Sequence, residues 1–194
     1  MKVSDFRKAE NDVRDIFLNR WSARAMSGEK VSKKELMSLF EAARWAPSSS
    51  NEQPWRFVYV LKESKNWKKF FDLVVPGNQA WIEKAGALIV VISRKNWKED
   101  GSFNPTHSFD TGAAWENFAL EGSLKKLVVH GMAGFDYDKA KEMLKVSDEY
   151  KVEMMIGVGK PGKLADLPEK YRAREKPNGR NELSEMVFEE EFKG

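Results

Sequence analysis

The sequence of 194 residues has no cysteine and only two histidines, His107 and His130. The missing thiols exclude disulfide bonds, thiolate metal sites and a cysteine nucleophile. Neither histidine has a carboxylate at metal-ligand spacing along the chain, so no metal site is expected. A nucleophile at Ser48, Ser49 or Ser50 would need a base, and these two distant histidines are the only candidates, which makes serine catalysis a poor interpretation.

Long apolar runs and a strong excess of one charge are also missing. The longest apolar stretch, residues 85–92, is too short to span a bilayer. The charged N-terminus lacks the apolar segment of a signal peptide, so a cytoplasmic location is expected. The net charge is +3 with scattered lysines, whereas nucleic-acid-binding proteins usually concentrate basic residues on one face. We therefore expect no nucleic acid and no membrane partner, and keep a basic RNA- or polyanion-binding protein as a distant alternative.

The composition, 41% hydrophobic and 32% charged, is typical of a globular protein, and the length favours one domain over residues 1–194. Helical and strand patterns alternate, which predicts a layered arrangement of helices and sheet. Helices are predicted over residues 4–19, 32–46, 65–73, 111–126 and 136–144, strands over 57–61, 86–93, 127–129 and 150–156, and turns at 76–78 and 130–134. Four strands are few for this length, and residues 183–192 do not look able to fold back alone. An arm that packs on a partner subunit would explain both observations.

One familiar motif is rejected. Residues 157–162 match the G-x-G-x-x-G pattern of dinucleotide-binding folds and follow a predicted strand. That pattern needs a helix to begin there, so that free amides meet the pyrophosphate. Pro161 and the following residues break up any such helix, so we predict a plain turn.

Two basic segments are candidates for binding an anion. The segment Arg20-Trp21-Ser22-Ala23-Arg24 carries two guanidinium groups that can converge on one phosphate. The alternative is a solvated helix end, where cations favour the C-terminal dipole. The turn of residues 177–180 adds the guanidinium group of Arg180. Taken alone, one arginine in such a turn is typical of a solvent-exposed surface.

The segment APSSSNEQPW, residues 46–55, concentrates short hydrogen-bonding side chains between two prolines. It could be a polar loop whose serines and asparagine satisfy their own backbone. The prolines reduce the freedom of the loop, which a mere connection does not need. This stiffness favours a surface that presents donors and acceptors to a ligand.

Together these motifs give the chain a resemblance to the nitroreductase family of flavin enzymes, over nearly its whole length. The motifs that carry it, in chain order, are Arg20-x-Ser22-x-Arg24, residues 46–55, Asp110 to Asn117, Gly131 to Asp136, and Pro177 to Arg180 followed by Leu183 to Val187. Each motif alone is modestly specific, and the five in order are strongly specific.

The resemblance implies an α+β fold, a three-layer α/β/α sandwich with a mixed, largely antiparallel central sheet. It also implies an intertwined homodimer with an exchanged C-terminal arm and FMN at the subunit interface. The implied activity is ping-pong hydride transfer from NAD(P)H through FMN to nitroaromatic, quinone or related electron-poor acceptors. FMN carries this chemistry, so no catalytic residue is implied. A reductive dehalogenase or a flavin-modifying enzyme of the same fold is the alternative.

By resemblance, fourteen residues contact FMN. Those implied at the phosphate are Arg20, Trp21, Ser22, Arg24 and Arg180. Those implied to reach the flavin of the other subunit are Pro47, Ser48, Ser49, Asn51 and Gln53. Those implied at the flavin ring are Asn78, Met132, Ala133 and Gly134. Trp21 departs from the family, which often has a basic residue there, and the loop of residues 95–109 matches no subgroup.

Overall fold

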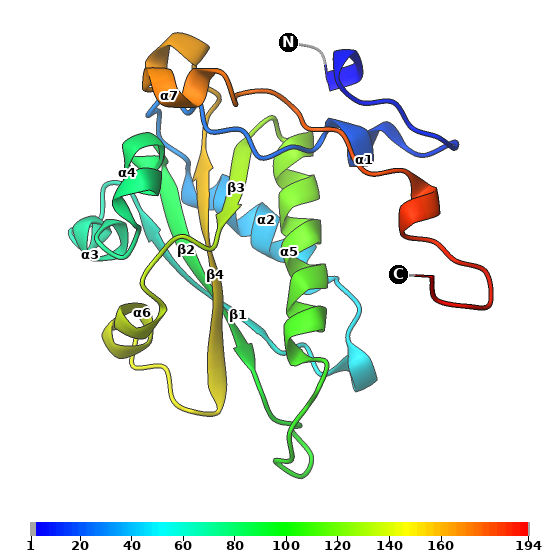
Figure 1. Ribbon diagram of the computed structural model, residues 1–194. Helices are drawn as coiled ribbons and strands as arrows, with labels where there is room; N and C mark the ends of the chain where they lie inside the picture. The colour runs from blue at the N-terminus through cyan, green and yellow to red at the C-terminus, as the bar shows by residue number, and fades with distance from the viewer. Residues whose placement is uncertain (1–2, 194) are drawn as a thin grey trace.

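The computed structural model describes residues 3–193 and contains a four-stranded sheet in the order β1-β2-β4-β3 (Figure 1). The strands are β1 (Trp55–Leu61), β2 (Ala87–Arg94), β3 (Val128–Met132) and β4 (Tyr150–Gly159). The three pairings between these strands are all antiparallel. The predicted α+β fold with a largely antiparallel sheet is confirmed.

Strand β2 lies inside the sheet and is buried on both faces, as its unbroken apolar run predicts. Its side chains alternate between two apolar cores, one on each face of the sheet. Leu88, Val90 and Ile92 belong to one core, and Ala87, Ile89 and Val91 belong to the other.

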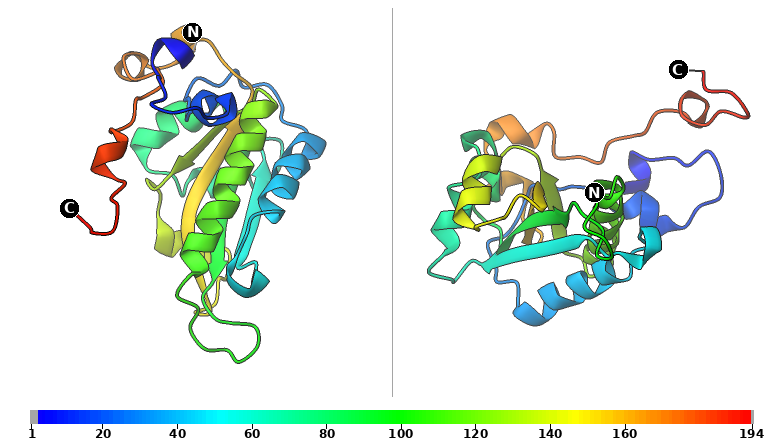
Figure 2. Two further views of the ribbon diagram at one scale, coloured as in Figure 1. Left: turned by 90° about the vertical axis from the view of Figure 1, so that its right-hand side faces the viewer. Right: turned by 90° about the horizontal axis from the view of Figure 1, so that it is seen from below.

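Helices cover both faces of the sheet (Figure 2). Helices α2 (Lys33–Arg44) and α5 (His107–Leu124) supply one core, and α3 (Trp67–Phe71), α4 (Pro76–Ile82) and α6 (Tyr137–Met143) supply the other. This arrangement confirms the three-layer sandwich.

Shorter elements complete the described chain. They are the 3-10 turns η1 (Val3–Asp5), η2 (Ser49–Asn51), η3 (Leu164–Asp166) and η4 (Leu183–Glu185), with the helices α1 (Asp15–Asn19) and α7 (Glu169–Arg172). Strand β4 is followed by η3 and not by an α-helix, and Gly162 N donates to Ala25 O at 2.9 Å. Residues 157–162 therefore end a strand and do not open a helix, which confirms the rejection of the dinucleotide motif. None of the described helices is long and apolar enough to cross a membrane.

The predicted capping signals are present. The Ser32 side chain accepts from Glu35 N, and the Glu35 carboxylate accepts from Ser32 N at 2.9 Å, which forms the capping box of α2. Asp136 caps α6 by accepting from Lys139 N at 2.9 Å.

The long helix predicted over residues 4–19 is wrong. Only η1 and α1 are helical there. The apolar residues that suggested it, Phe6, Val13 and Phe17, are 38–53% exposed, so they gain no tertiary packing within one chain. A helix of this length depends on such packing. Arg7 instead binds this segment to the carbonyls of Leu18, Arg20 and Asn178.

Two predicted turns are also wrong. Residues 76–78 open α4, with Pro76 in the first turn, where its missing N–H costs nothing. Residues His130–Met132 continue β3, because they pair with β4 opposite Gly157, Ile156 and Met155. Helix α5 begins at His107, four residues before the predicted start.

The end of the chain leaves the body of the fold. Figure 2 shows the C-terminal segment projecting away from the sheet and helices. Leu183, Met186, Val187 and Phe192 on this arm are 41–82% exposed. An arm with this much apolar surface is suited to packing on a second subunit, and its exchange in a homodimer stays a prediction.

Candidate functional site

A cluster of arginines lies where the extended segment after α1 meets the C-terminal turn. Arg7 Nη1 donates to Leu18 O and to Arg20 O, and Arg7 Nε donates to Asn178 O, each at 2.7 Å. Burial lowers the pKa of Arg7, and the charges of Arg180 and Arg20 lower it further. Arg7 therefore joins the segment that carries Arg20 to the turn that carries Arg180. Sequence reasoning missed Arg7 because it lay on the polar face of a predicted helix.

Carboxylates balance little of this charge. Arg20 Nη1 donates to Ser22 Oγ at 3.4 Å, and Arg20 Nε lies 3.5 Å from Glu116 Oε1 on α5. Within residues 3–193, this is the one salt bridge made by Arg7, Arg20 or Arg180. The cluster keeps an excess of positive charge that suits a phosphate.

The segment of Arg20 is also fixed by Glu175, which bonds to the backbone at its end. This residue is 6% exposed, and its Oε1 accepts from Arg24 N at 2.7 Å and from Ala25 N at 2.8 Å. Charge-assisted bonds to two consecutive amides hold the extended backbone in place. No sequence signal distinguished Glu175 from its many charged neighbours.

A second set of contacts joins Arg24, Asn78 and Gly134. The Arg24 guanidinium lies 5.8 Å from the centroid of the Trp81 ring. Trp81 Nε1 donates to Asn78 Oδ1, and Asn78 Nδ2 donates to Gly134 O, both at 3.2 Å. A Cβ at Gly134 would lie 2.5 Å from Asn78 Nδ2, so this approach requires glycine. Arg24 and Asn78 thus both contact Trp81, and Gly134 contacts Asn78. No sequence motif marked Trp81.

His130 lies against the same indole, with ring centroids 4.4 Å apart. Its Nδ1 is 2.9 Å from Ala23 O, which can only accept, so Nδ1 carries the hydrogen. Burial lowers the pKa of His130 to about 4, and the charges of Arg24 and Arg20 contribute to this shift. The ring is therefore neutral near pH 7 and adds no charge beside the arginines.

The other residues of the predicted turn occupy different positions. Met132 ends β3 opposite Met155 and is 5% exposed. Ala133 is exposed and its carbonyl accepts from Phe135 N at 3.0 Å. The turn therefore begins at Ala133 and presents the backbone next to Gly134 and Asn78.

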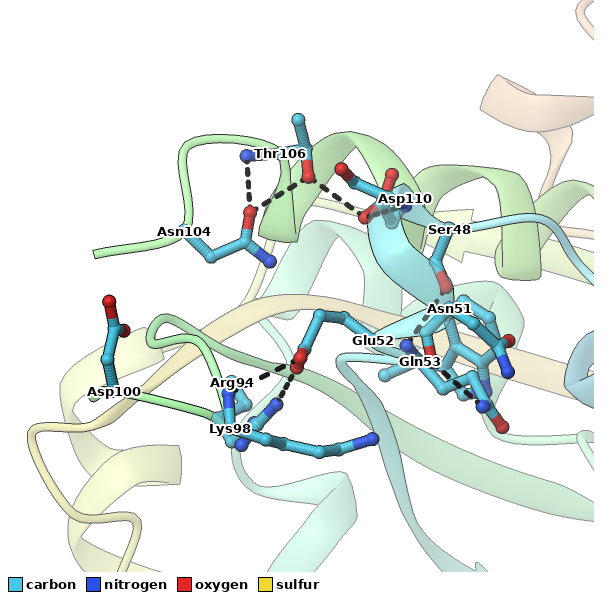
Figure 3. Close-up of polar contacts among 12 residues, drawn as sticks. Ser48, Asn51, Glu52, Gln53, Arg94, Lys98, Asp100, Asn104, Thr106 and Asp110 are labelled. Carbon is cyan, nitrogen blue, oxygen red and sulfur yellow. Dashed lines mark hydrogen bonds and ion pairs between the residues drawn. The ribbon is translucent and has the colours of Figure 1, made fainter. Parts of the chain in front are cut away.

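The proline loop, residues 47–53, is attached to the first turn of α5 (Figure 3). Ser49 N donates to Asp110 Oδ2 at 3.2 Å. Within the loop, Gln53 N donates to Ser48 Oγ at 3.0 Å, and Gln53 Nε2 donates to Asn51 O at 2.9 Å. The short polar side chains partly satisfy the loop itself, as one of the two interpretations expected.

The same loop has strained backbone. Ser50, Asn51 and Gln53 have φ angles of 50°, 55° and 48°. This left-handed conformation costs an L-residue about 1–2 kcal/mol, and somewhat less for asparagine. Strain of this kind persists where surrounding contacts impose it, and it clusters at ligand sites. The loop thus combines hydrogen bonds to its own backbone with backbone strain, and its contact with a ligand stays a prediction.

The two groups of predicted residues lie at different levels of α5. The proline loop contacts Asp110, whereas a cavity of about 530 Å³ beside Arg20 and Trp21 is lined by Ala119 and Ser123. These α5 residues are separated by about 14–20 Å along the helix axis. In Figure 1 the loop lies near the lower end of α5 and the arginine segment near its upper end. One chain does not bring the fourteen residues into a single site.

A separate buried polar cluster contains the second histidine. His107 Nδ1 lies 2.7 Å from Ser93 Oγ and 3.6 Å from Glu153 Oε1. Glu153 was missed because it is far along the chain.

The serines of the proline loop have no hydrogen bond to either histidine among the described residues. The described chain also holds no cluster of three or more possible metal ligands.

Comparison with known proteins identifies the family. A family model described as the nitroreductase family matches residues 18–160. The chain belongs to the nitroreductase family. The matched range contains every predicted cofactor residue except Arg180.

Two relatives of this nitroreductase-family chain match most of its length, and a third matches about half of it. A solved structure described as an oxidoreductase containing FMN is 41% identical, with a TM-score of 0.94, and the match covers 97% of this chain and 96% of that one. Protein DrgA of Synechocystis is 27% identical over 192 residues, covering 84% of this chain and 89% of DrgA. An oxygen-insensitive NADPH nitroreductase of Helicobacter pylori is 36% identical over 96 residues, which cover 49% of this chain and 43% of that protein.

Proposed function

We propose that the protein is an FMN-dependent oxidoreductase that takes a hydride from NAD(P)H and delivers it to nitroaromatic, quinone or related electron-poor acceptors. The observation that carries this proposal is the likeness over almost the whole chain to an oxidoreductase containing FMN. The NADPH nitroreductase among the relatives supports the choice of donor and acceptor.

The residues present fit FMN at its phosphate end. Arg7, Arg20 and Arg180 concentrate positive charge that Glu116 neutralises only in part. Guanidinium groups bind phosphate through paired, charge-assisted hydrogen bonds. We infer that Arg20 and Arg180 hold the phosphate with Ser22, and that Arg7 fixes the two segments from which they project.

The residues also fit a flavin ring. Asn78 is bonded to the backbone of Gly134, and Arg24 reaches the same place through Trp81. FMN would supply the chemistry, since it accepts a hydride from NAD(P)H and passes it to an oxidant. The resemblance implies Arg24 at the phosphate, but its contact with Trp81 beside Asn78 supports a place at the ring. There Arg24 would favour negative charge at the adjacent edge of the ring, and Asn78 with the backbone of Ala133 and Gly134 would orient it.

A homodimer would complete the site. The proline loop is displaced along α5 from the arginine cluster, so it would reach the flavin of the other subunit. The exposed apolar arm after Glu182 supplies a surface for the partner. Each subunit would then contribute Pro47, Ser48, Ser49, Asn51 and Gln53 to the flavin that the other holds.

A visible spectrum of the purified protein tests the proposal. We expect flavin absorbance bands, or their appearance after reconstitution with FMN. Oxidation of NADH and NADPH should then be measured with a nitroaromatic compound and with a quinone, because the comparison identifies the donor. A colourless protein that does not take up FMN would contradict the proposal.

A further inference from the structure

Glu52 is buried although it belongs to the strained proline loop. It is 8% exposed, and its Oε2 forms an ion pair with Nη2 of Arg94, the last residue of β2. Its Oε1 accepts from Lys98 N at 3.4 Å (Figure 3). A carboxylate in this position needs the guanidinium, because an unpaired buried charge is strongly unfavourable.

Arg94 holds the loop a second time through its backbone. Arg94 N donates to Pro54 O at 2.9 Å, and Arg56 Nη1 donates to Gln53 O at 3.0 Å. Gln53, with its positive φ, lies between the two residues that Arg94 contacts. The end of β2 therefore imposes the conformation that the loop would not adopt by itself.

The hairpin of residues 95–106 is attached to the same loop at both of its ends. Lys98 contacts Glu52 near the start of the hairpin. At its end, Thr106 Oγ1 donates to Asp110 Oδ2 at 3.0 Å, and the same oxygen accepts from Ser49 N. A displacement of the hairpin would thus reach the loop through two carboxylates.

We propose that Glu52 is a positioning residue for the cofactor site: its ion pair with Arg94 fixes the proline loop in the conformation that meets the flavin of the other subunit. This inference rests on the proposed function. Glu52 acts through Arg94 and the loop backbone, because its carboxylate is bonded to Arg94 and to Lys98 N. It follows that the hairpin of residues 95–106 and the flavin environment are coupled through Glu52.

The test compares Glu52→Gln with the control Glu41→Gln in the FMN-loaded protein. Glu41 also forms a glutamate–arginine pair, but that pair is exposed on α2. For Glu52→Gln we expect FMN to dissociate roughly tenfold faster, the size of a lost charge-assisted contact. The visible circular dichroism of the bound flavin should change as well. For Glu41→Gln we expect both signals to match the wild type.

A loss of folding stability alone would not support the proposal. If Glu52→Gln unfolds at lower temperature but keeps the wild-type dichroism and FMN release, Glu52 is structural and the proposal is overturned. If Glu52→Gln does not fold, the double variant Glu52→Gln/Arg94→Gln removes the unpaired charge. Fast FMN release from that variant supports positioning, and wild-type release overturns it. A wild-type protein without FMN contradicts the proposed function itself, which the spectrum shows beforehand.

Discussion

The arginine segment, residues 20–24, and the proline loop, residues 47–53, are held in place by different kinds of contact. The arginine segment is extended and has no positive φ, and buried Glu175 and His130 bind its backbone. The proline loop contains three residues of positive φ and is held by Asp110 and by the pair of Glu52 with Arg94.

The two segments would therefore bind a ligand through different properties, one through its charge and the other through its fixed shape. The arginine segment concentrates charge on a relaxed backbone, so its substitutions should act on ligand affinity. The proline loop presents a fixed shape and carries backbone strain. Substitutions that relieve this strain should therefore raise folding stability and weaken ligand binding.

Removal of the arm should have the largest effect, because in the proposed homodimer it would separate the two regions that meet at each flavin. A chain that ends at Glu182 loses the exposed apolar residues of the arm. We expect a monomer that does not retain flavin, since each flavin would lose the proline loop of the other subunit. Light scattering and flavin absorbance measure both properties. A truncated chain that stays dimeric and yellow would show that the arm does not build the interface.

At acidic pH, the protein should lose the stabilisation that neutral His130 provides by binding the backbone of the arginine segment. The pKa of His130 is about 4 in the folded protein, below about 6.5 in an unfolded chain. The unfolded state therefore binds the proton first as the pH falls. The stability from neutral His130 is complete above pH 6.5 and is lost as the pH falls toward 4. At pH 4.5 the loss should be about 2–3 kcal/mol.

Urea unfolding at pH 7.5 and pH 4.5 measures this effect. His130→Gln keeps a donor for Ala23 O but does not titrate, so its stability should change less between the two conditions. The pKa of Glu35 is lowered to about 2, mainly by Lys160, so stability from Glu35 is lost below pH 4.5 in both proteins. Equal pH dependence in wild type and variant would rule out His130 as the group responsible.

Charge removal should affect affinity and leave the fold intact. Arg20→Ala or Arg180→Ala should each weaken FMN binding by roughly 1.5–3 kcal/mol, the value of a charged hydrogen bond. Arg14→Ala is a matched control, because Arg14 is exposed and forms no salt bridge within residues 3–193. Fluorescence titration with FMN measures the affinities. Unchanged binding in both variants would remove the phosphate role from these arginines.

Local signals predicted much of the fold. The capping box at Ser32, the cap at Asp136 and the unbroken apolar run of β2 each depend on neighbouring residues, and each is present. The helix over residues 4–19 was wrong because its apolar face has no packing partner within one chain. Periodicity alone cannot show whether such a partner exists.

The candidate site was predictable only where a motif marks it. Asn78 and Gly134 are in contact, as their implied common role requires. Arg7, Glu175 and Glu52 could not be found, because each acts through a residue distant in sequence. Arg7 bonds Asn178, and Glu175 bonds Arg24. Their types and spacings resemble those of ordinary surface charges, so only the fold shows what they contact.

The smallest effect should come from relieving strain in the proline loop. The sign of the stability change distinguishes the proline loop from the arginine segment. Ser50 has a φ of 50° and no described hydrogen bond from its side chain, so glycine fits the backbone better. Ser50→Gly should raise stability by up to about 1 kcal/mol and weaken FMN binding, because the loop gains freedom that binding must remove. Urea unfolding and FMN titration measure the two changes. Arginine variants should weaken binding without this gain in stability. If Ser50→Gly lowers stability, the loop is not strained, and the two regions prepare their surfaces in the same way.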